Sequence, residues 1–585
     1  MNSLVLAIGA GIFYLIAYYT YGRYLGRKIF KLNAENEAPS VKFEDNVDYV
    51  PSKKQVLFGH HFTSIAGTGP IVGPAIAIIW GWLPALIWVL LGSVFMGAVH
   101  DFGTLVVSMR NRGRSIGDVA GDMISPRAKL LFLFIIFFVL LIVIAIFGVV
   151  IGEVFRLYPE SVFPVWFQIP IAITLGYFIY KKKASLFWPS IAAVALMYVT
   201  IVIGSWMPVY MPTFEAVGAG GTVLFKIEPV AIWVLLMLVY VYFASILPVN
   251  VLLQPRDYIN SHQLFVALTL LALGIIVTRP EMVAPVVNWH PTGAPPMFPL
   301  IFVVIACGAI SGFHSLVSSG TSSKQCDSEP NSLFIGYGSM LIEGMVAVIV
   351  IIACGAGVGL GLEDGGVLYK GADAFNHQYS SWGSVNSGGL GHNIKAFITG
   401  SSRMLEGIGI PPMISNTLMG VFIASFAATT LDTATRIQRY IITELSESFS
   451  SKLFTNKHAA TSLAVGTAFL LAFHNGSSGK GALTLWPLFG CTNQLLGGLA
   501  LLVITVYLAV KRCPLYVTLI PMLFMLVMTA WAMFNTIHGF IHAGNWLLLF
   551  VGAMISCLEL WMLVESFFVL KRIFKNRNSV MVENN

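Results

Sequence analysis

The chain has 585 residues, of which 57% are hydrophobic and only 10% are charged, and its formal net charge is +7. Soluble domains carry roughly 25% charged residues, so this composition excludes a soluble protein and indicates a polytopic, all-α membrane protein. The positive charges flank apolar segments, so the expected surrounding is a lipid bilayer and no nucleic-acid partner is expected.

Apolar runs near the ~20 residues that cross a bilayer predict fifteen membrane spans. In chain order they fall at residues 3–22, 56–80, 83–107, 130–150, 163–180, 186–206, 229–250, 262–278, 297–320, 333–358, 413–431, 459–474, 482–510, 515–536 and 545–570. The run at 459–474 is the shortest. A basic cluster at 23–31 follows the first run instead of preceding it, which is typical of an uncleaved anchor with its N-terminus outside.

The Lys and Arg residues test the resulting topology. Of the 34 in the chain, 27 fall in segments that this topology places inside, and seven fall in segments that it places outside. Cytoplasmic loops carry an excess of Lys and Arg, so the split favours an outside N-terminus, an outside segment at 361–403 and a cytoplasmic C-terminus. On this count no basic residue lies within a span.

The six cysteines indicate neither a disulfide framework nor a metal site. None falls in a segment placed outside, and no Cys-x-x-Cys or other zinc spacing occurs. His60 and His61 are adjacent, so on a helix their side chains point about 100° apart and cannot easily bind one metal. No metal and no cofactor are expected, and a hydrogen-bonded structural role is the main alternative for either histidine.

The predicted span at 56–80 contains the most unusual sequence in the chain. Between Phe58 and Pro74 it holds four glycines, two prolines and two adjacent histidines. Proline and glycine both weaken the helical hydrogen-bond ladder, so we expect the helix to break near Gly67–Pro74. Broken backbone at membrane depth is tolerated only where it is buried or lines a cavity, and many secondary transporters build their binding sites this way. The alternative is a kinked helix that serves only close packing.

A related pattern recurs later in the chain. The spacing Gly-x-His-x5-Gly-Thr occurs twice, at Gly59, His61, Gly67 and Thr68 and at Gly312, His314, Gly320 and Thr321. The second copy runs into a hydroxyl-rich stretch at 315–323, where a second break is expected. The two predicted spans cross the bilayer in opposite directions, which fits inverted repeats that each begin with a broken helix. Chance is the alternative, because only four of ten positions match and two of these are Gly. The apolar residues mostly follow the first copy but precede the second, which leaves the structural equivalence of the copies open.

Acidic residues in or beside the spans are candidates for ion coupling. They are Asp101, Glu343, Asp432, Glu559 and Glu565. Glu343 lies mid-span with no basic residue in its span, and a charge there costs at least ~2.5 kcal/mol, so we expect a protonated carboxyl that ionises during transport. The alternatives are a Glu343 that only hydrogen-bonds a neighbouring helix, an i,i+4 pair between Asp432 and Arg436, and a pairing of Asp101 with Arg110.

Several stretches resemble the carbon starvation A (CstA) transporter family. They are Val56–Phe62 with Gly67–Pro70, Gly97–Phe102, Gly113–Gly117, Ala306–His314, Thr429–Arg436 and Pro487–Leu495. They occur in order between residues 56 and 495, which makes the match specific. The chain is shorter than better-known members of the family, which leaves the oligomeric state and the substrate open.

The resemblance implies a secondary transporter of the bacterial plasma membrane. It also implies a distant similarity to the amino acid–polyamine–organocation (APC, LeuT-like) superfamily, with a 5+5 inverted-repeat core, broken helices and extra helices. On that layout, residues 1–55 form an anchor helix and a basic cytoplasmic loop, 56–570 the transporter core and 571–585 a cytoplasmic tail. The core divides into repeat-like halves at about 56–206 and 297–510, linking helices at 229–278 and C-terminal helices at 515–570.

Members of this family are linked to peptide uptake in carbon starvation and to proton-coupled pyruvate uptake. With the residues above, the resemblance implies import of a small carboxylate-bearing nutrient. Free backbone N–H groups at a helix break favour an anion. The expected substrate site comprises the two breaks, at His60, His61, Gly67, Thr68, Gly69, Pro70, His314, Ser318, Ser319 and Thr321. The expected proton-coupling carboxyls are Glu343, Asp101 and Asp432.

Other functions stay open at this point. Hydroxyl-rich breaks also coordinate Na⁺, so a sodium-coupled symporter is one alternative, and a non-coupled channel or a nutrient sensor is another. An intramembrane enzyme is not expected, because no Gly-x-Ser-x-Gly, His-Glu-x-x-His or paired Asp motif occurs.

Overall fold

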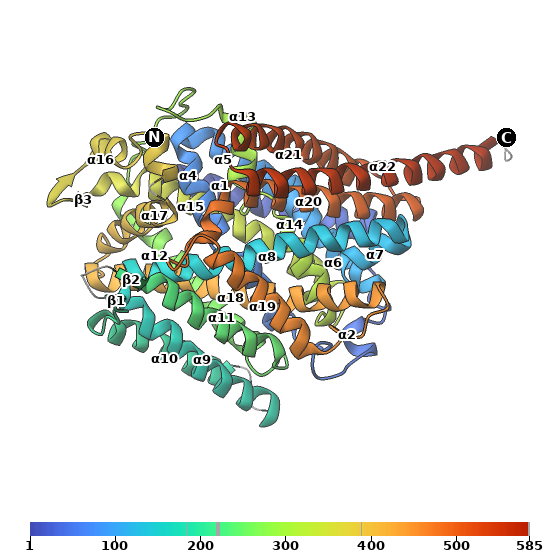
Figure 1. Ribbon diagram of the computed structural model, residues 1–585, viewed down its shortest axis with the longest axis horizontal. Coiled ribbons are helices and arrows are strands. Elements are labelled where there is room, and N and C mark those ends of the chain that lie inside the picture. Colours follow the sequence, from blue (N-terminus) through green and yellow to red (C-terminus); the bar gives the residue numbers. More distant parts are fainter. Residues whose placement is uncertain (184, 186, 218–222, 388, 583–585) are drawn as a thin grey trace.

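The computed structural model describes residues 1–183, 185, 187–217, 223–387 and 389–582 (Figure 1). Residues 583–585 of the expected cytoplasmic tail lie outside the described residues. Within the described ranges the chain is predominantly helical, so the predicted all-α fold is confirmed. The strands there form two antiparallel hairpins, β1 (Phe214–Val217) with β2 (Val223–Ile227) and β3 (Leu362–Asp364) with β4 (Val367–Tyr369).

Twelve of the described helical segments are long and apolar enough to cross a membrane, and one bent pair of helices adds a thirteenth span. The twelve are built on α1 (Ser3–Ala17), α5 (Trp82–Gly92) with α6 (Ala98–Arg110), α8 (Pro126–Leu157), α9 (Val162–Gly176), α10 (Phe187–Trp206), α11 (Pro229–Ile246), α12 (Leu253–Thr278), α15 (Ser339–Gly355), α18 (Pro412–Ser448), α20 (Trp486–Val510), α21 (Tyr516–His542) and α22 (Trp546–Val582). The polytopic membrane class is therefore confirmed.

The predicted count of fifteen spans is not confirmed. The run at 459–474 forms α19 (Lys457–Phe473), which has only 17 residues, and the run at 297–320 forms two short helices. These two runs account for the whole difference between the predicted and the observed sets. Both fall short for the same reason, since neither supplies a continuous apolar helix of spanning length.

The predicted break in the span at 56–80 is present. The bent pair consists of α3 (Lys54–Ile65) and α4 (Gly69–Ala77), which are separated by residues 66–68, and the two segments differ in direction by 43°. Pro70 lies in the first turn of α4, where its missing N–H has no helical partner to lose. Pro70 therefore favours the start of a new helix at the point where the chain changes direction after α3.

A second break separates α13 (Met297–Val304) from α14 (Gly312–Gly320). It lies at 305–311, ahead of the hydroxyl-rich stretch at 315–323. The expected break in that stretch is present only near its end, because residues 315–320 continue α14, which ends at Gly320 and is followed by a 3-10 turn at Ser322–Lys324. The recurring Gly-His-Gly-Thr pattern occupies non-equivalent places as a result. Both copies end where a helix ends, but the first copy begins within α3, whereas the second begins just after a break.

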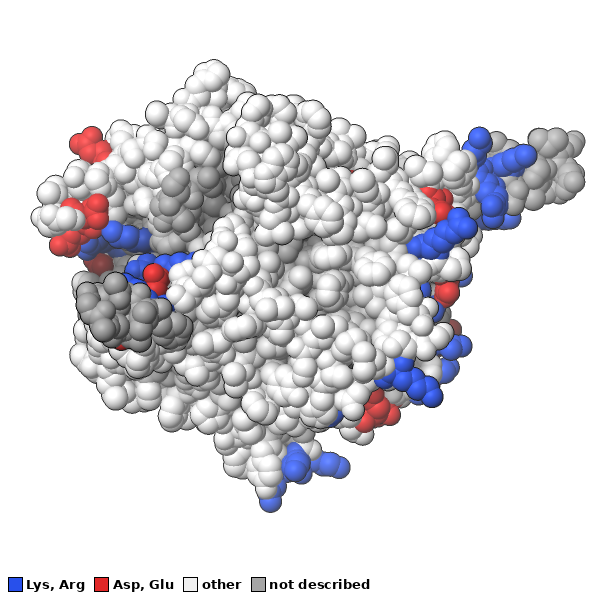
Figure 2. All heavy atoms as spheres, viewed as in Figure 1, with Lys and Arg blue, Asp and Glu red and all other residues white. Residues whose placement is uncertain are grey.

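The broken helices lie in the interior. In the core, α12 packs on α3, α15 on α4, α14 on α6 and α20, and α18 along α8. Figure 1 places the N-terminus, β3 and α16 (Gly371–Gln378) toward one end, and α2 (Pro39–Lys42), α7 (Ile116–Met123) and the C-terminal end toward the other. Charged side chains gather mostly at these two ends, with an uncharged belt between them (Figure 2). A belt of this kind fits a bilayer around the middle of the molecule.

Candidate functional site

The two breaks lie against each other. Gly69, at the start of α4, approaches the linker between α13 and α14 so closely that a Cβ atom on it would overlap the side chain of Cys307. On the other side of the contact, a Cβ on Gly308 would lie 3.5 Å from the Cβ of Pro70, and the φ of Gly308 is +87°, which L side chains rarely adopt. The close approach therefore requires glycine at position 69. Position 308 requires glycine for other reasons, namely its positive φ and the Cβ of Ala347 on α15, which would lie 2.7 Å from an added Cβ.

A cavity of about 120 Å³ adjoins this contact. Its lining residues include Gly69, Gly73, Cys307, Trp382, Trp486 and Phe489. Trp382 belongs to the segment between β4 and α17 (Gly389–Glu406), which lies at the N-terminal end of the molecule. The cavity therefore connects the helix breaks with the segment that the charge pattern predicts to be outside.

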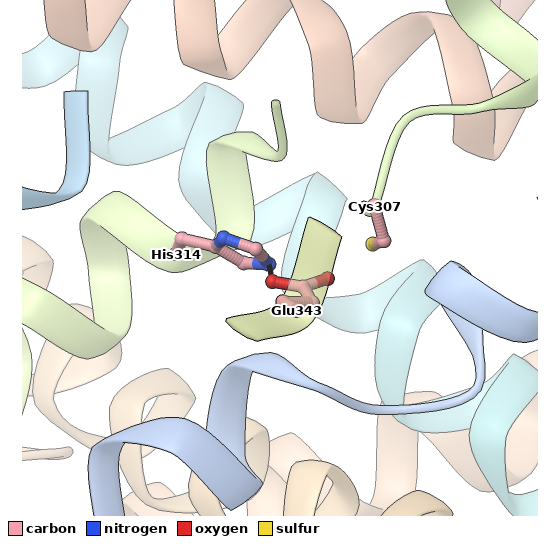
Figure 3. Close-up of side chains that lie close together, drawn as sticks. All are labelled: Cys307, His314 and Glu343. Carbon is pink, nitrogen blue, oxygen red and sulfur yellow. Dashed lines mark ion pairs between the residues drawn. The ribbon is translucent and has the colours of Figure 1, made fainter. Parts of the chain in front are cut away.

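Three buried titratable side chains, Glu343, His314 and Asp101, form a chain beside the breaks, and Figure 3 shows the pair of Glu343 and His314. Glu343 of α15 accepts the backbone N–H of Gly308 at 3.0 Å through Oε1, and its Oε2 lies 3.4 Å from Nε2 of His314. The other ring nitrogen of His314 lies 3.1 Å from Oδ2 of Asp101 on α6. Oδ1 of Asp101 is in turn 2.7 Å from Nδ1 of His100. One imidazole thus connects two carboxyl groups, and one of those carboxyls binds the linker of the second break.

Cys307 adds a third ligand-type group to this cluster. Its Sγ, a nitrogen of His314 and an oxygen of Glu343 all lie within 4.8 Å of one another. In a tetrahedral zinc site, ligand atoms stand roughly 3.5 Å apart, so these three groups would have to draw together to hold an ion. The imidazole and the carboxyl already have protein partners. We therefore interpret the cluster as an acid–base chain.

The adjacent histidines of α3 contact different partners, in keeping with the helical spacing. Nδ1 of His60 contacts the carboxylate of Asp257 on α12, and Nδ1 of His61 lies 2.8 Å from the hydroxyl oxygen of Ser322. Both rings are fully buried, and their Nε2 atoms have no hydrogen-bond partner within the described part of the chain. The two histidines thus hold α3 to two separate elements.

A second buried charge network lies where α11, α12 and α18 meet, and sequence reasoning did not find it. Arg256, in the first turn of α12, forms an ion pair with Asp432 of α18, and the hydroxyl of Tyr240 bonds to both. The prediction that no basic residue lies within a span is wrong, because the helix begins at Leu253 and takes Arg256 into the interior. Tyr240, Arg256 and the adjoining Asp257 are the functional candidates that were missed.

The proposed alternative partners of the acidic residues are also wrong. Arg436 bonds to Asp48 at 2.9 Å instead of to Asp432, and Arg110 pairs with Glu329 instead of with Asp101. Asp48 lies in the loop before α3. Burial raises the pKa of its carboxyl. The nearby positive charges of Arg436, Arg439 and Lys324, together with a hydrogen bond from the Tyr440 hydroxyl, lower the pKa by more than burial raises it. The net pKa therefore lies below the ordinary value.

The remaining predicted substrate residues fall into two groups. Thr68 lies in the first break, with its buried hydroxyl unpartnered among the described residues, and Gly67 packs against Thr430. Three hydroxyl residues, Ser318, Ser319 and Thr321, lie at the far end of α14, and the latter two form hydrogen bonds within the protein. The structure thus gathers Thr68, Gly69, Pro70 and His314 around the breaks and places residues 318–321 apart from them.

The local sequence around Arg256 predicts a loop, whereas the structure has a buried helix there. The mostly polar run at 254–263 precedes an apolar run that begins at Leu264, and that order is typical of a loop before a span. The structure continues the helix through this run because its charged groups find partners on α3, α11 and α18. The partners on α3 and α18 are far away in the sequence. The only local hint of such a pairing is a charged residue that lies within a predicted span, such as Asp432.

Comparison with known proteins adds sequence relatives and fold neighbours. A family model described as carbon starvation protein CstA matches residues 2–532. The chain is 33% identical over 569 residues to the peptide transporter CstA of Campylobacter jejuni, with 90% of this chain and 79% of that protein covered. It is 31% identical over 593 residues to the pyruvate/proton symporter BtsT of Escherichia coli, with 91% and 81% covered.

Among solved structures, the fold resembles a manganese transporter of Eremococcus coleocola. The TM-score is 0.50 at 13% sequence identity, and the match covers 91% of this chain and 99% of that one. At this identity the likeness concerns the fold alone.

Proposed function

This chain belongs to the carbon starvation protein CstA family, and on that premise we propose that it imports a small carboxylate-bearing nutrient, a short peptide or pyruvate, by symport with protons. Its relatives are named as transporters of these two substrate classes. The chain is a multi-pass membrane transporter and not an enzyme. The proposed location is the bacterial plasma membrane, with the N-terminus outside and the C-terminus in the cytoplasm.

The observation that carries the proposal is the position of Glu343 between an imidazole and a helix break. An ionised Glu343 accepts the N–H of Gly308 and pairs with a protonated His314. A proton on this carboxyl removes its negative charge, so it weakens both contacts and loosens the linker that packs against Gly69. Protonation of one side chain then changes the packing of both broken helices, which is the link between proton and conformation that coupled transport needs.

His314 also offers a route for the proton. Its Nε2 faces Glu343 and its Nδ1 faces Asp101, so the ring can take a proton on one nitrogen and release one from the other. The three groups come from α6, α14 and α15, which pack together in the core. Asp432 forms a buried ion pair with Arg256, so we assign it a structural role instead of a role in proton coupling.

The substrate carboxylate is proposed to bind at the start of α4. The helix dipole is positive there, which favours an anion. Pro70 has no N–H, and the N–H groups of Ile71 and Val72 donate to the carbonyl oxygen of Thr68, so the N–H of Gly69 is the backbone donor left at this helix start among the described residues. The unpartnered hydroxyl of Thr68 adds a donor, and the adjoining cavity of about 120 Å³ supplies space. No Lys or Arg is among the described residues that line this cavity, so the anion is not held by a permanent charge and can be released.

Uptake into proteoliposomes tests the proposal. Radiolabelled pyruvate and a radiolabelled dipeptide are compared under an imposed pH gradient and under an imposed Na⁺ gradient. Accumulation of either substrate above equilibrium, driven by the pH gradient and abolished by a protonophore, supports proton symport. Accumulation that needs only the Na⁺ gradient would replace the proton with sodium, and movement that never exceeds equilibrium would indicate a channel. Absence of uptake of both substrates would contradict the proposed substrate class.

A further inference from the structure

A second cavity, of about 910 Å³, opens at the end of the molecule that the charge pattern predicts to be cytoplasmic. It is bounded by residues 29–31, residues 36–43 around α2, the end of α6 and the end of α20. Basic side chains are visible at this end in Figure 2. Five basic residues line the cavity, which we name the basic cleft: Lys31, Lys42, Arg110, Arg112 and Lys511.

Acidic residues neutralise only part of this charge. Glu329 pairs with Arg110, and Glu37 pairs with Lys42 at 3.0 Å. Arg110 also donates to the carbonyl oxygen of Phe30 at 2.7 Å, so its guanidinium is fixed as part of the wall. The other three basic residues are exposed and form no ion pair within the described part of the chain: Lys31, Arg112 and Lys511. Three positive charges are thus left around the cleft.

Apolar groups form much of the remaining wall. The buried side chains among them are Ile29, Phe30, Ala38, Pro39 and Met109. Beyond Cys513, which also lines the cleft, the chain enters α21, where Tyr516 and Ile520 are 52% and 64% exposed on a face that a bilayer would cover. The cleft therefore lies where charged headgroups and acyl chains meet.

We propose that the basic cleft binds the phosphate group of an anionic phospholipid from the cytoplasmic leaflet. Basic pockets at the cytoplasmic membrane surface bind such headgroups, because they combine positive charge with nearness to the anionic leaflet. The apolar wall and the exposed face of α21 accommodate acyl chains, which a free phosphate or a nucleotide lacks. A lipid bound here ties residues 29–43 to the ends of α6 and α20.

The test measures lipid retention by the purified, full-length protein. Native mass spectrometry compares phosphatidylglycerol and cardiolipin with phosphatidylcholine, and sodium phosphate and ATP serve as soluble phosphate competitors. The test variant is Lys31→Gln/Arg112→Gln/Lys511→Gln. The matched control is Lys181→Gln/Lys182→Gln/Lys183→Gln, which removes the same number of exposed charges from another loop that is predicted to be cytoplasmic.

We expect the test variant to bind anionic lipid roughly tenfold more weakly or worse, and the control to bind within about twofold of the wild type. Phosphatidylcholine binding should not change in either variant. Equal thermal unfolding of all three proteins in a neutral detergent shows that the effect is not misfolding. Retention of anionic lipid by the test variant would overturn the proposal. Displacement of the lipid by millimolar phosphate or ATP, with no preference for lipid, would overturn the assignment to a phospholipid and assign the cleft to a soluble phosphate compound.

Discussion

Gly69 and Cys307 meet at the point where the two broken helices touch, and a Cβ atom on the glycine would overlap both the Cβ and the Sγ of the cysteine. The contact joins the start of α4 to the linker between α13 and α14. Because packed interiors do not absorb an extra methyl group without a shift, movement of one break must be accompanied by movement of the other. The linker is thus held from two sides, by the packing of Cys307 against Gly69 and by the hydrogen bond from Gly308 to Glu343.

Gly69→Ala should lower substrate uptake by roughly tenfold or more, since overpacking typically costs about 1–3 kcal/mol. Gly69→Leu should be at least as severe, because it also fills the adjoining cavity. The double variant Gly69→Ala/Cys307→Gly removes both clashing atoms and leaves the Cα of residue 307 at 3.8 Å, an ordinary contact. We expect it to recover much of the lost uptake, measured in proteoliposomes and normalised to folded protein.

The single variant Cys307→Gly is the control, and it should stay close to wild-type uptake if the thiol serves only packing. Wild-type uptake by a well-expressed Gly69→Ala protein would show that the close contact of the breaks is not needed. A double variant as inactive as Gly69→Ala would place the defect outside the contact with Cys307.

Glu343→Gln should separate binding from energy coupling. The amide oxygen can still accept the N–H of Gly308, but the side chain can no longer gain or lose a proton. We expect the variant to exchange substrate across the membrane in counterflow while it fails to accumulate substrate under a pH gradient. Both assays are run in the same liposomes.

Asp101→Asn is the matched comparison, because Asp101 is as deeply buried and faces the other nitrogen of His314. It should slow pH-driven uptake and counterflow by similar factors if it positions the imidazole. Uphill, pH-driven accumulation by Glu343→Gln would mean that Glu343 is structural, and the coupling group would then be sought at Asp101 or His61.

Arg256→Leu should destabilise the protein by about 3–5 kcal/mol, because it leaves the Asp432 carboxylate buried without its partner. The double variant Arg256→Leu/Asp432→Leu removes both charges and should be closer to the wild type than the single variant. Glu406→Leu, which breaks a partly exposed i,i+3 pair with Arg403, is the control and should cost about 1 kcal/mol or less. Thermal unfolding in detergent ranks the four proteins. An Arg256→Leu protein as stable as the wild type would show that the pair contributes no stability.

Local sequence was sufficient to predict the first break, the long apolar spans and the unusual position of Glu343. Each depends on a property of a single segment, such as the glycines and prolines of residues 67–74 or the absence of cations from one span. The partners of Glu343 could not be predicted in the same way. His314 and Gly308 lie on other elements, and a pairing of that kind depends on how helices far apart in the sequence come together.

The second break shows a limit of motif matching. The pattern around Gly312 and Gly320 repeats the spacing around Gly59 and Gly67, and equal spacing suggested equal structure. The longer interruption precedes Gly312, where Gly308 adopts a positive φ in the linker, whereas residues 312–320 form an ordinary helix that ends only at Gly320. Many serines in a row can bond back to their own helix, so they do not by themselves end it.

Topology is tested by cysteine labelling at Ser384→Cys and Ser450→Cys. The first position lies in the segment predicted to be outside, and the second lies between α18 and α19, on the predicted cytoplasmic side. A membrane-impermeant thiol reagent should label Ser384→Cys in intact cells and Ser450→Cys only after permeabilisation. The unmodified chain measures the background from the native cysteines. The reverse pattern would invert the orientation of the protein.

The final prediction concerns Asp48, which holds the loop before α3 against α18. Its carboxylate bonds to Arg436, to Arg439 and to the hydroxyl of Tyr440, and its pKa lies below the ordinary value of about 3.9. A carboxyl with a lowered pKa in the folded state contributes stability that is complete above its unfolded pKa. That stability is lost as the pH falls through the folded pKa. The contribution should therefore be constant near neutral pH and disappear progressively below about pH 4.

Asp48→Asn should consequently destabilise the protein by about 3 kcal/mol at pH 7, since it leaves the buried Arg436 without its counterion. The difference between variant and wild type should begin to shrink as the pH falls below about 4, where the unfolded wild-type carboxyl takes up a proton. It should disappear once the pH has fallen below the lowered pKa of the folded carboxyl. Unfolding midpoints at a series of pH values measure this difference, and the titration of all other carboxyls cancels in it. Glu37→Gln is the control: its pair with Lys42 is more than half exposed, so its effect should stay below about 1 kcal/mol at every pH. A difference for Asp48→Asn that is the same at pH 3 and at pH 7 would show that the anchor of this loop does not depend on the charge of Asp48.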